Sequence, residues 1–362
     1  MIANLNLIAT AIGLLALVGG WRTAQPGWTY EFPRDHHGHA DFKTEWWYFT
    51  GNLTNKGGRR FGYELTFFRQ GIRPPGERVG TSSRLIVDDL KFAHFTITDV
   101  SGKRFLFYDK ASRGSFGEAG FGKGDRLAWI DHWRVEMKAD GTFELFADAA
   151  EGEIRLQLAQ TKKPVIHGSE GVSRKAVGND HASHYYSITR LITSGSLVAG
   201  GKDFIVTGDS WFDHEWATNQ LASNQAGWNW VSAQFDDGCE LMLYGMRLKN
   251  GGIDPASSGT FVLEDGSTVP LSSTEFQMIP QSFWDSAATK ASYPIGWNIM
   301  VPKLDLRFEL RPVLPNQELV LAPLTYWEGA FDLSGMHQKK KIGGYGYLEL
   351  TGYASPLEEL NR

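Results

Sequence analysis

Apolar and polar positions alternate along most of the chain from Trp28 onward, as in β-strands whose successive side chains point to opposite faces. Turns that contain glycine interrupt this alternation at short intervals. The dipeptides Asp140-Gly141, Asp237-Gly238 and Asp265-Gly266 are typical of two-residue hairpin turns, and apolar alternation flanks each of them. Because no segment keeps a helical period for long, the pattern predicts a mostly β protein.

The two halves of the chain follow the same plan. Four features recur in the same order: a Trp-rich strand, its hairpin partner, a second hairpin and a closing Thr-Gly pair, at residues 47–53, 64–69, 95–105 and 207–208, and again at 228–230, 240–247, 261–269 and 351–352. This order predicts a duplicated β domain with its junction near Ala217, so that the domains span residues 27–217 and 218–362. Chance likeness between generic hairpins is the alternative explanation.

Antiparallel domains of this size hide their strand edges by closing into a barrel or by stacking two sheets. A barrel of about eight strands leaves room for side chains or for one small ligand. A cavity that binds an apolar ligand is therefore the default expectation for each domain.

The composition adds many turns and bulky side chains to this picture. The 362 residues include 41 Gly, 13 Trp, 12 Tyr and 22 Phe, and the glycine content exceeds the usual value of about 7%. The net charge is −5, and the longest basic run is residues 339–341, so nucleic acid is not an expected partner. Cys239 is the single cysteine, which excludes an intramolecular disulfide.

The N-terminus carries an apolar stretch at residues 7–18, followed by Gly19 and Gly20. The stretch is shorter than the roughly 20 residues that a membrane span needs, and it resembles the hydrophobic part of a signal peptide. Residues 1–25 are therefore predicted to be a cleaved signal peptide or an N-terminal anchor, which places the protein in the periplasm or cell envelope. A misassigned start or a buried helix is the alternative.

The densest chemical block is residues 208–216. If this block is a strand, Trp211, Asp213 and Glu215 share one face, and Phe212, His214 and Trp216 share the other. Aromatic surroundings and a second carboxylate raise the pKa of a carboxyl group, so that one of the two acids can stay protonated near neutral pH and act as a general acid. A solvated strand end is the competing interpretation.

A second block, residues 181–188, places His184, Tyr186 and Ile188 on one strand face, where the histidine could position a water molecule. A satisfied core histidine is the alternative. A third block, residues 34–48, contains three histidines and three acidic residues, but their spacing fits no standard zinc signature. We expect no metal there and interpret the segment as a loop that caps the mouth of the cavity.

Other catalytic signatures are missing from the sequence. It has no Gly-x-Ser-x-Gly elbow, and its glycines at 114–124 open no nucleotide-binding unit. We therefore expect no cofactor.

The Trp-rich blocks carry a family resemblance. The segments 32–36, 45–51, 211–216 and 227–230 resemble the AttH-like, lipocalin-like proteins related to carotenoid 1,2-hydratase, some of which are labelled predicted secreted hydrolases. The likeness runs from about Tyr30 to Tyr353. It implies an all-β fold of two lipocalin-like antiparallel barrel or sandwich domains packed side by side, with a cavity near their junction.

The resemblance also implies a function. Hydratases of this family add water to an isolated C=C bond of a long isoprenoid, and the matching positions here are His184 with Tyr186 and Trp211 with Asp213. They imply Asp213 as the catalytic acid and His184 as the residue that holds the water. We expect Glu215, on the same strand face as Asp213, to be a third catalytic residue that sets the proton balance of the pair. The substrate-binding residues that we expect are Trp47, Trp211, Trp216, Trp228, Trp230 and Tyr186. The expected ligand is a hydrophobic small molecule, isoprenoid or lipid-like.

Three alternatives stay open. The first is a non-catalytic envelope carrier that works beside a membrane or an ABC-type transporter. The second is a secreted hydrolase, in which Ser210 or Ser187 would need to lie within reach of His184 or His214. The third is a pericyclase-like cavity, as in fungal relatives of the fold.

Overall fold

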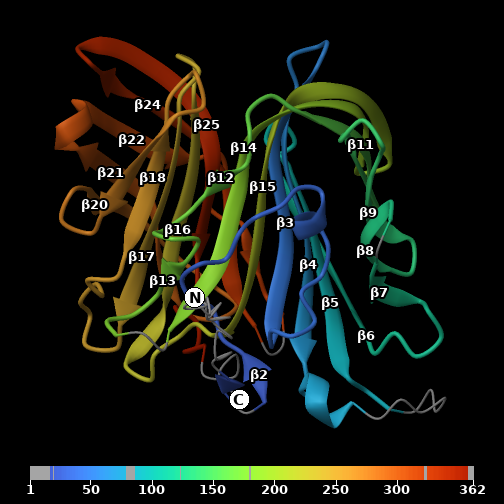
Figure 1. Cartoon of the computed structure of the whole chain (residues 1–362). Coiled ribbons are helices and arrows are strands. Elements are labelled where there is room, and N and C mark those ends of the chain that lie inside the picture. The colour runs from blue at the N-terminus through green and yellow to red at the C-terminus, as the bar shows by residue number, and fades with distance from the viewer. Residues whose placement is uncertain are drawn as a thin grey trace, which may run out of the picture.

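The computed structural model describes residues 17–18, 20–78, 86–122, 124–178, 181–321 and 324–357. Within these ranges the regular elements are strands and three short 3-10 helices, η1 (Arg34–His36), η2 (Pro75–Glu77) and η3 (Pro302–Leu304). The strands form one 13-stranded sheet, one 10-stranded sheet and a two-stranded ribbon. The two large sheets stand side by side (Figure 1), which confirms the predicted all-β class of two lipocalin-like domains.

The 13-stranded sheet forms the N-terminal domain. Its strands are β3 (Thr44–Asn55), β4 (Arg60–Gly71), β5 (Asp89–Asp99), β6 (Arg104–Ser112), β7 (Ala119–Phe121), β8 (Arg126–Ile130), β9 (Trp133–Met137), β10 (Phe143–Ala149), β11 (Gly152–Gln160), β12 (Val165–Ile166), β13 (Ser173–Arg174), β14 (Ala182–Ala199) and β15 (Lys202–Asn219). The main path runs β6-β5-β4-β3-β15-β14-β11-β10-β9-β8-β7. Because β5 and β6 also contact β8, the sheet is a nearly closed barrel.

The 10-stranded sheet forms the C-terminal domain and is a half-barrel. Its strands are β16 (Gln225–Phe235), β17 (Glu240–Leu248), β18 (Ser258–Val262), β19 (Thr268–Ser272), β20 (Gln277–Asp285), β21 (Ser292–Val301), β22 (Leu306–Pro312), β23 (Glu318–Leu319), β24 (Tyr326–His337) and β25 (Lys340–Leu350). The main path runs β19-β18-β17-β16-β25-β24-β22-β21-β20.

Part of the strand order is the same in the two sheets. In the first sheet β15 pairs with β3, and β4, β5 and β6 follow; in the second sheet β25 pairs with β16, and β17, β18 and β19 follow. The strands that carry the sequence repeat therefore occupy equivalent places in both sheets. The sheets divide the chain between Asn219 and Gln225, and Ala217 lies near the end of β15.

The three predicted hairpin turns connect neighbouring strands. Asp140-Gly141 joins β9 to β10, Asp237-Gly238 joins β16 to β17, and Asp265-Gly266 joins β18 to β19. Each glycine has a positive φ between 81° and 84°, a conformation that costs little only without a Cβ.

The predicted leader lies largely outside the described residues, which begin at Leu17. Its last part packs on the N-terminal domain. Here β1 (Leu17–Val18) pairs with β2 (Trp21–Arg22), the side chains of Trp21 and Ala24 are buried, and the Arg22 amide donates to the carbonyl of Asp41 at 2.9 Å. The packed chain therefore begins before the expected boundary at residue 27. Among the described residues, no helix is long and apolar enough to cross a membrane.

Each domain has its own apolar core, and a third cluster lies between the domains. This interdomain cluster contains Tyr48, Tyr185 and Trp211 from the first domain and Trp230 and Tyr244 from the second. Strands β3, β4 and β14 contact β25, β24 and β16 there. One face of β3, β14 and β15 thus serves the barrel core, and the other face serves the interdomain contact.

Candidate functional site

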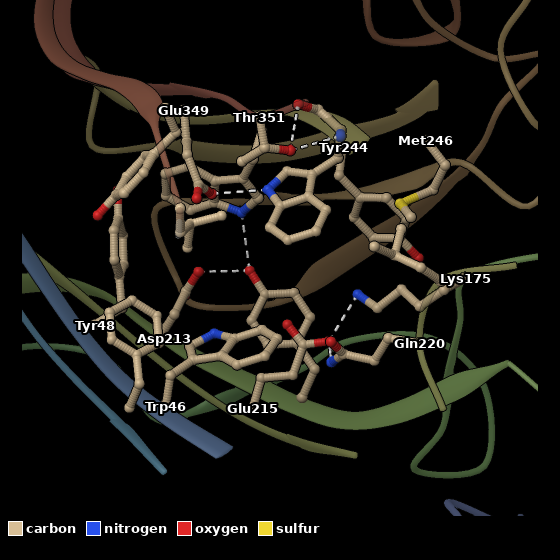
Figure 2. A pocket seen from close by; sticks show the side chains of 17 residues that line it. Trp46, Tyr48, Lys175, Asp213, Glu215, Gln220, Tyr244, Met246, Glu349 and Thr351 are labelled. Carbon is tan, nitrogen blue, oxygen red and sulfur yellow. Dashed lines mark hydrogen bonds and ion pairs between the residues drawn. The ribbon is translucent and has the colours of Figure 1, made fainter. Parts of the chain in front are cut away.

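A pocket opens between the two domains (Figure 2), and it holds about 940 Å³ of space not filled by protein atoms when the open mouth is included. Its walls come from both sheets. The residues that line it are Trp46, Tyr48, Phe68, Lys175, Tyr185, Asp213, Glu215, Gln220, Leu221, Trp228, Trp230, Tyr244, Met246, Leu324, Tyr326, Glu349 and Thr351. Eight of these are aromatic, so the pocket suits an apolar or π-rich ligand.

Asp213 accepts three side-chain hydrogen bonds in the pocket wall. Its Oδ1 accepts hydrogen bonds from the Ser187 hydroxyl and from Trp211 Nε1 at 2.6 Å, and its Oδ2 accepts one from the Tyr185 hydroxyl at 2.5 Å. Burial raises the pKa of Asp213 to about 7, against the lowering effect of these hydrogen bonds. The carboxyl group is therefore protonated to a large extent near neutral pH.

Glu215 lies on the same strand face as Asp213, two residues further along β15. Its Oε1 accepts a hydrogen bond from Gln220 at 3.1 Å and pairs with Lys175 Nζ at 2.9 Å. Burial alone would lower the pKa of Lys175, but the carboxylate of Glu215 and the neighbouring Tyr244 outweigh it, and the pKa lies above its usual value. The pair is thus a buried ion pair beside a largely neutral acid.

Glu349 lies on β25 and faces the pocket from the second domain. Trp228 Nε1 donates to its Oε2 at 2.8 Å, and burial raises its pKa to about 8. Behind it, Glu328 stands directly opposite on β24 and accepts a hydrogen bond from the Tyr48 hydroxyl at 2.6 Å. Burial and these nearby carboxyl groups also raise the pKa of Glu328 well above its usual value. The interdomain wall therefore holds several carboxyl groups in their neutral form.

The structure brings together one part of the predicted site. Asp213, Glu215, Trp228 and Trp230 line the pocket, and Trp211 reaches it indirectly through its bond to Asp213. The predicted strand faces of the 208–216 block are those of the structure, since these residues of β15 alternate between the pocket and the barrel.

The structure separates the other part. His184 pairs with Trp216, and Tyr186 with His214, across β14 and β15, so all four side chains point into the barrel end of the first domain. Opposite Asp213 on β14 stands Ser187. His184 therefore cannot hold water beside Asp213, and its Nδ1 instead bonds the Gly171 carbonyl at 2.7 Å. Because side chains alternate along a strand, a shift of one residue changes the face.

Trp47, Trp216 and Tyr186 likewise lie on the barrel face rather than in the pocket. Trp47 stacks on His214 with ring centroids 4.6 Å apart, and Trp216 stacks on His39 at 3.7 Å. These predicted substrate-binding residues are in the hydrophobic core of the N-terminal domain or at its end.

Sequence reasoning missed several pocket residues. Trp46 and Tyr48 stand opposite Glu215 and Asp213 on β3, so the alternation within the Trp-Trp-Tyr run, once aligned with β15, would have identified them. Tyr185 follows from the same argument on β14. Lys175 and Glu349 come from distant segments, and no local sequence signal marks them.

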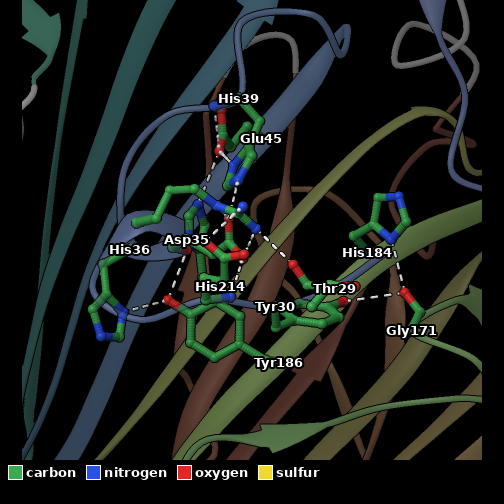
Figure 3. Close-up of polar contacts among 12 residues, drawn as sticks. Thr29, Tyr30, Asp35, His36, His39, Glu45, Gly171, His184, Tyr186 and His214 are labelled. Carbon is green, nitrogen blue, oxygen red and sulfur yellow. Dashed lines mark hydrogen bonds and ion pairs between the residues drawn. The ribbon is translucent and has the colours of Figure 1, made fainter. Parts of the chain in front are cut away.

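The 34–48 block forms a network of charges at the end of the barrel (Figure 3). His39 bonds Glu45 through Nδ1 at 2.7 Å and Asp35 through Nε2 at 3.3 Å. His214 Nε2 lies 3.0 Å from Glu45 Oε1, and Arg69 Nε donates to Glu45 Oε2 at 3.3 Å. Burial alone would lower the pKa of His39, but the two carboxylates raise it above its usual value. Apart from Trp46 and Tyr48, which line the pocket from β3, the segment lies on the barrel side of the sheet, which corrects its interpretation as a cap of the cavity mouth.

Two groups of side chains have the composition of metal sites among the described residues. His39, Glu45 and His214 form one, and Asp237, Cys239 and His337 form the other, each with ligand atoms within 4.8 Å of one another. In the first group both ring nitrogens of His39 already bond carboxylates, an arrangement that suits an imidazolium ion. In the second, His337 Nδ1 bonds Asp237 at 2.7 Å.

The serines proposed as nucleophiles have other partners. Ser210 bonds the hydroxyls of Tyr63 at 2.6 Å and Thr193 at 2.7 Å. Ser187 contacts a histidine that the sequence argument did not consider, His167, whose Nε2 lies 2.7 Å from its Oγ. Because the Ser187 hydroxyl also donates to Asp213 and is fully buried, it supports the acid rather than facing a ligand.

The fold and the pocket define a two-domain, lipocalin-like β protein with an acidic, aromatic site between its domains. The profile of the AttH-like family matches residues 23–353, and the chain belongs to this family. A solved structure of an AttH protein from Nitrosomonas europaea is 31% identical, with a TM-score of 0.80, over 91% of this chain and 98% of that one.

Two named sequence relatives are a hydratase and a dehydratase. Kievitone hydratase of Fusarium solani subsp. phaseoli is 26% identical over 175 residues, which span 47% of this chain and only 49% of that protein. The dehydratase asqC of Emericella nidulans is 22% identical over 293 residues, 71% of this chain and 75% of that protein. The relatives thus include enzymes named for adding water and for removing it.

Proposed function

We propose that this protein adds water to a C=C bond of a largely apolar ligand, or removes it in the reverse direction, in the pocket between its domains. The observation that carries the proposal is Asp213, a buried acid whose pKa is raised to about 7, in an aromatic pocket beside the ion pair of Glu215 and Lys175. A carboxyl group that holds its proton near neutral pH can act as a general acid, and a second one on the same strand face can act as the base. The names of the two relatives support the same reaction class.

Asp213 acts first, as the general acid. Among the described residues, Oδ2 accepts one hydrogen bond, from Tyr185, while Oδ1 accepts two, so Oδ2 is the oxygen with room for a proton directed at the ligand. The proton passes to one carbon of the double bond, and the other carbon becomes a carbocation. Asp213 is left as a carboxylate, which the three donors around it stabilise.

The aromatic walls stabilise the cation. Trp46 and Tyr48 line the pocket from β3, and Trp228 and Trp230 line it from β16, with the ring centroids of Tyr48 and Trp230 5.3 Å apart. A desolvated cation gains up to about 2 kcal/mol from an aromatic face. Tyr186, one of the expected substrate-binding residues, lies on the barrel face and takes no part in this stabilisation.

Glu215 acts last, as the base. Lys175 and Gln220 both bond its Oε1, and within the described part of the chain its Oε2 is left to accept a proton from water. The water oxygen forms the new C–O bond and gives a proton to Glu215. Residues two apart on a strand have Cα atoms roughly 7 Å apart, a spacing that leaves room for a water molecule and a double bond between the two side chains. The proton returns to Asp213 before the next turnover.

The test compares Asp213→Asn with wild type and with Asp203→Asn, a matched change at an exposed position of the same strand. Each protein is incubated in ¹⁸O-labelled water with a panel of isoprenoid alkenes, and products are analysed by mass spectrometry. Wild type and Asp203→Asn should incorporate one ¹⁸O per product, and Asp213→Asn should lose at least about 100-fold in rate. Equal rates in all three proteins would refute the acid role.

The initial rate should also depend on pH. Because the reaction needs protonated Asp213, hydration should fall as the pH rises through about 7. A rate that rises over the same interval contradicts the scheme.

A carrier function is the second candidate, and the predominantly aromatic lining of the pocket favours it. A carrier for an isoprenoid or lipid-like molecule would bind the alkene panel, quench tryptophan fluorescence and form no product. Asp213→Asn would then weaken binding, whereas in an enzyme it leaves binding nearly intact. As a carrier, the protein would work in the cell envelope beside a transporter, with residues 1–25 as its signal peptide or anchor.

A further inference from the structure

A chain of hydrogen bonds runs from the C-terminal domain to Asp213. Thr260 Oγ1 lies 2.9 Å from His167 Nδ1, His167 Nε2 lies 2.7 Å from Ser187 Oγ, and Ser187 donates to Asp213 Oδ1. The first three side chains are at most 4% exposed. Thr260 belongs to β18 in the second sheet, so the chain crosses the domain boundary.

His167 is fixed in place by its surroundings. It follows β12, its amide donates to the Tyr185 carbonyl at 3.0 Å, and its ring lies 4.3 Å from the Tyr185 ring. Burial, with a smaller contribution from Lys175, lowers the pKa of His167 to about 3. The ring is therefore neutral, with one donor nitrogen and one acceptor nitrogen.

Because the neutral ring has one donor and one acceptor nitrogen, all hydrogen bonds of this series donate in the same direction. When Asp213 is ionised, the Ser187 hydroxyl donates to it, so Ser187 accepts from His167 Nε2 and His167 Nδ1 accepts from Thr260. Protonation of Asp213 on Oδ2 leaves this direction unchanged because Oδ1 remains an acceptor, whereas protonation on Oδ1 reverses every donor. Ser187 and His167 each donate one hydrogen bond and accept one in either direction, so the bond between Ser187 and Asp213 is kept in both protonation states of the acid.

We infer that His167 is a positioning residue for the acid: through Ser187 it holds the Asp213 carboxyl group in one orientation, so that Oδ2 stays directed to the pocket. The inference rests on the proposed function for its catalytic meaning, and on the hydrogen-bond chain for its geometry. Without His167, the Ser187 hydroxyl loses the partner that fixes its rotation, and its bond to ionised Asp213 weakens.

The test follows the protonation of Asp213 directly. The infrared carboxyl band of Asp213 is isolated by subtracting the spectrum of Asp213→Asn and is followed from pH 5 to 9, which needs no substrate. The titratable groups that face Asp213 stay the same in all variants. They are Glu215 on β15, Tyr185 on β14, Lys175 in the segment that precedes β14, and Glu328 and Glu349 in the second sheet.

Three variants report on the chain. Ser187→Ala removes a hydrogen bond to the charged form and should raise the midpoint of Asp213 by about one pH unit. His167→Leu should raise it in the same direction. His167→Gln is the matched control, because its amide can still donate to Ser187 from nearly the position of Nε2, and it should restore the wild-type midpoint.

The outcomes separate a positioning role from a packing role. Unchanged midpoints in folded Ser187→Ala and His167→Leu would overturn the inference, as would equal midpoints for His167→Leu and His167→Gln. If His167→Leu does not fold, Thr260→Val tests the far end of the chain and should also raise the midpoint. Raised midpoints in a protein that hydrates none of the alkenes would support the positioning of Asp213 and refute the proposed function.

Discussion

The neutral form of Glu349 should make the protein less stable as the pH rises. This side chain is partly buried between the domains at the wall of the pocket, and burial raises its pKa to about 8, against 4.5 for an ordinary glutamate. A carboxyl group with a raised pKa binds its proton more tightly in the folded than in the unfolded chain. Its contribution to stability is therefore complete below about pH 4.5 and is lost as the pH rises through about 8.

The size of the loss follows from the two pKa values. A tenfold difference in proton affinity is worth about 1.4 kcal/mol, so Glu349 should cost roughly 3 kcal/mol of stability by pH 7 and about 5 kcal/mol near pH 9, relative to pH 4. Glu349→Gln removes the ionisation and keeps an oxygen for the hydrogen bond from Trp228. As the pH rises, the free energy of unfolding of the variant should therefore exceed that of wild type by these additional amounts.

The assay is urea denaturation of both proteins at pH 5, 7 and 9, followed by circular dichroism and tryptophan fluorescence. Glu264→Gln is the control. Because Glu264 is exposed between β18 and β19 of the second domain, the stability of this variant should equal that of wild type at every pH. A constant difference between Glu349→Gln and wild type from pH 5 to 9 would refute the reasoning, because only a change in proton binding makes the difference grow.

Three further predictions concern the walls of the pocket and the barrel. Lys175→Met leaves the buried carboxylate of Glu215 without its cation and should cost about 3 to 5 kcal/mol in denaturation; adding Glu215→Gln should recover much of it. Gly62→Ala would place a Cβ 2.8 Å from the Cβ of Ala330 across the domain contact, and should lower stability by about 1 to 3 kcal/mol and change ligand-induced fluorescence quenching. His214→Leu breaks the barrel network and should lower the melting temperature, while the infrared midpoint of Asp213 stays at the wild-type value.

The fold could be predicted from the sequence because its signals are local. Alternating polarity, the Asp-Gly turns and the repeated order of hairpins each act over a few residues, and together they defined an all-β protein of two like domains. The start of the packed chain was harder to locate. Trp21 and Ala24 are buried by contacts with the N-terminal domain that no local pattern near them announces.

The site could be predicted only along single strands. The alternation within β15 placed Asp213 and Glu215 on one face correctly. Choosing their partners on β14 required the pairing register, and the hypothesis selected His184 and Tyr186 where the register provides Tyr185 and Ser187. A one-residue difference moves a side chain through the sheet, so motif resemblance without register assigns residues to the wrong face about as easily as to the right one.

The aromatic and acidic motif on β15 therefore has two separate tasks. Its odd-numbered members, Asp213 and Glu215, face the pocket, and its even-numbered members, His214 and Trp216, lock the 34–48 segment onto the end of the barrel. Both faces of the strand are buried, one by the barrel and one by the second domain. Because the strand is buried on both faces, Asp213 is shielded from water, and this burial raises its pKa in a pocket that admits a ligand.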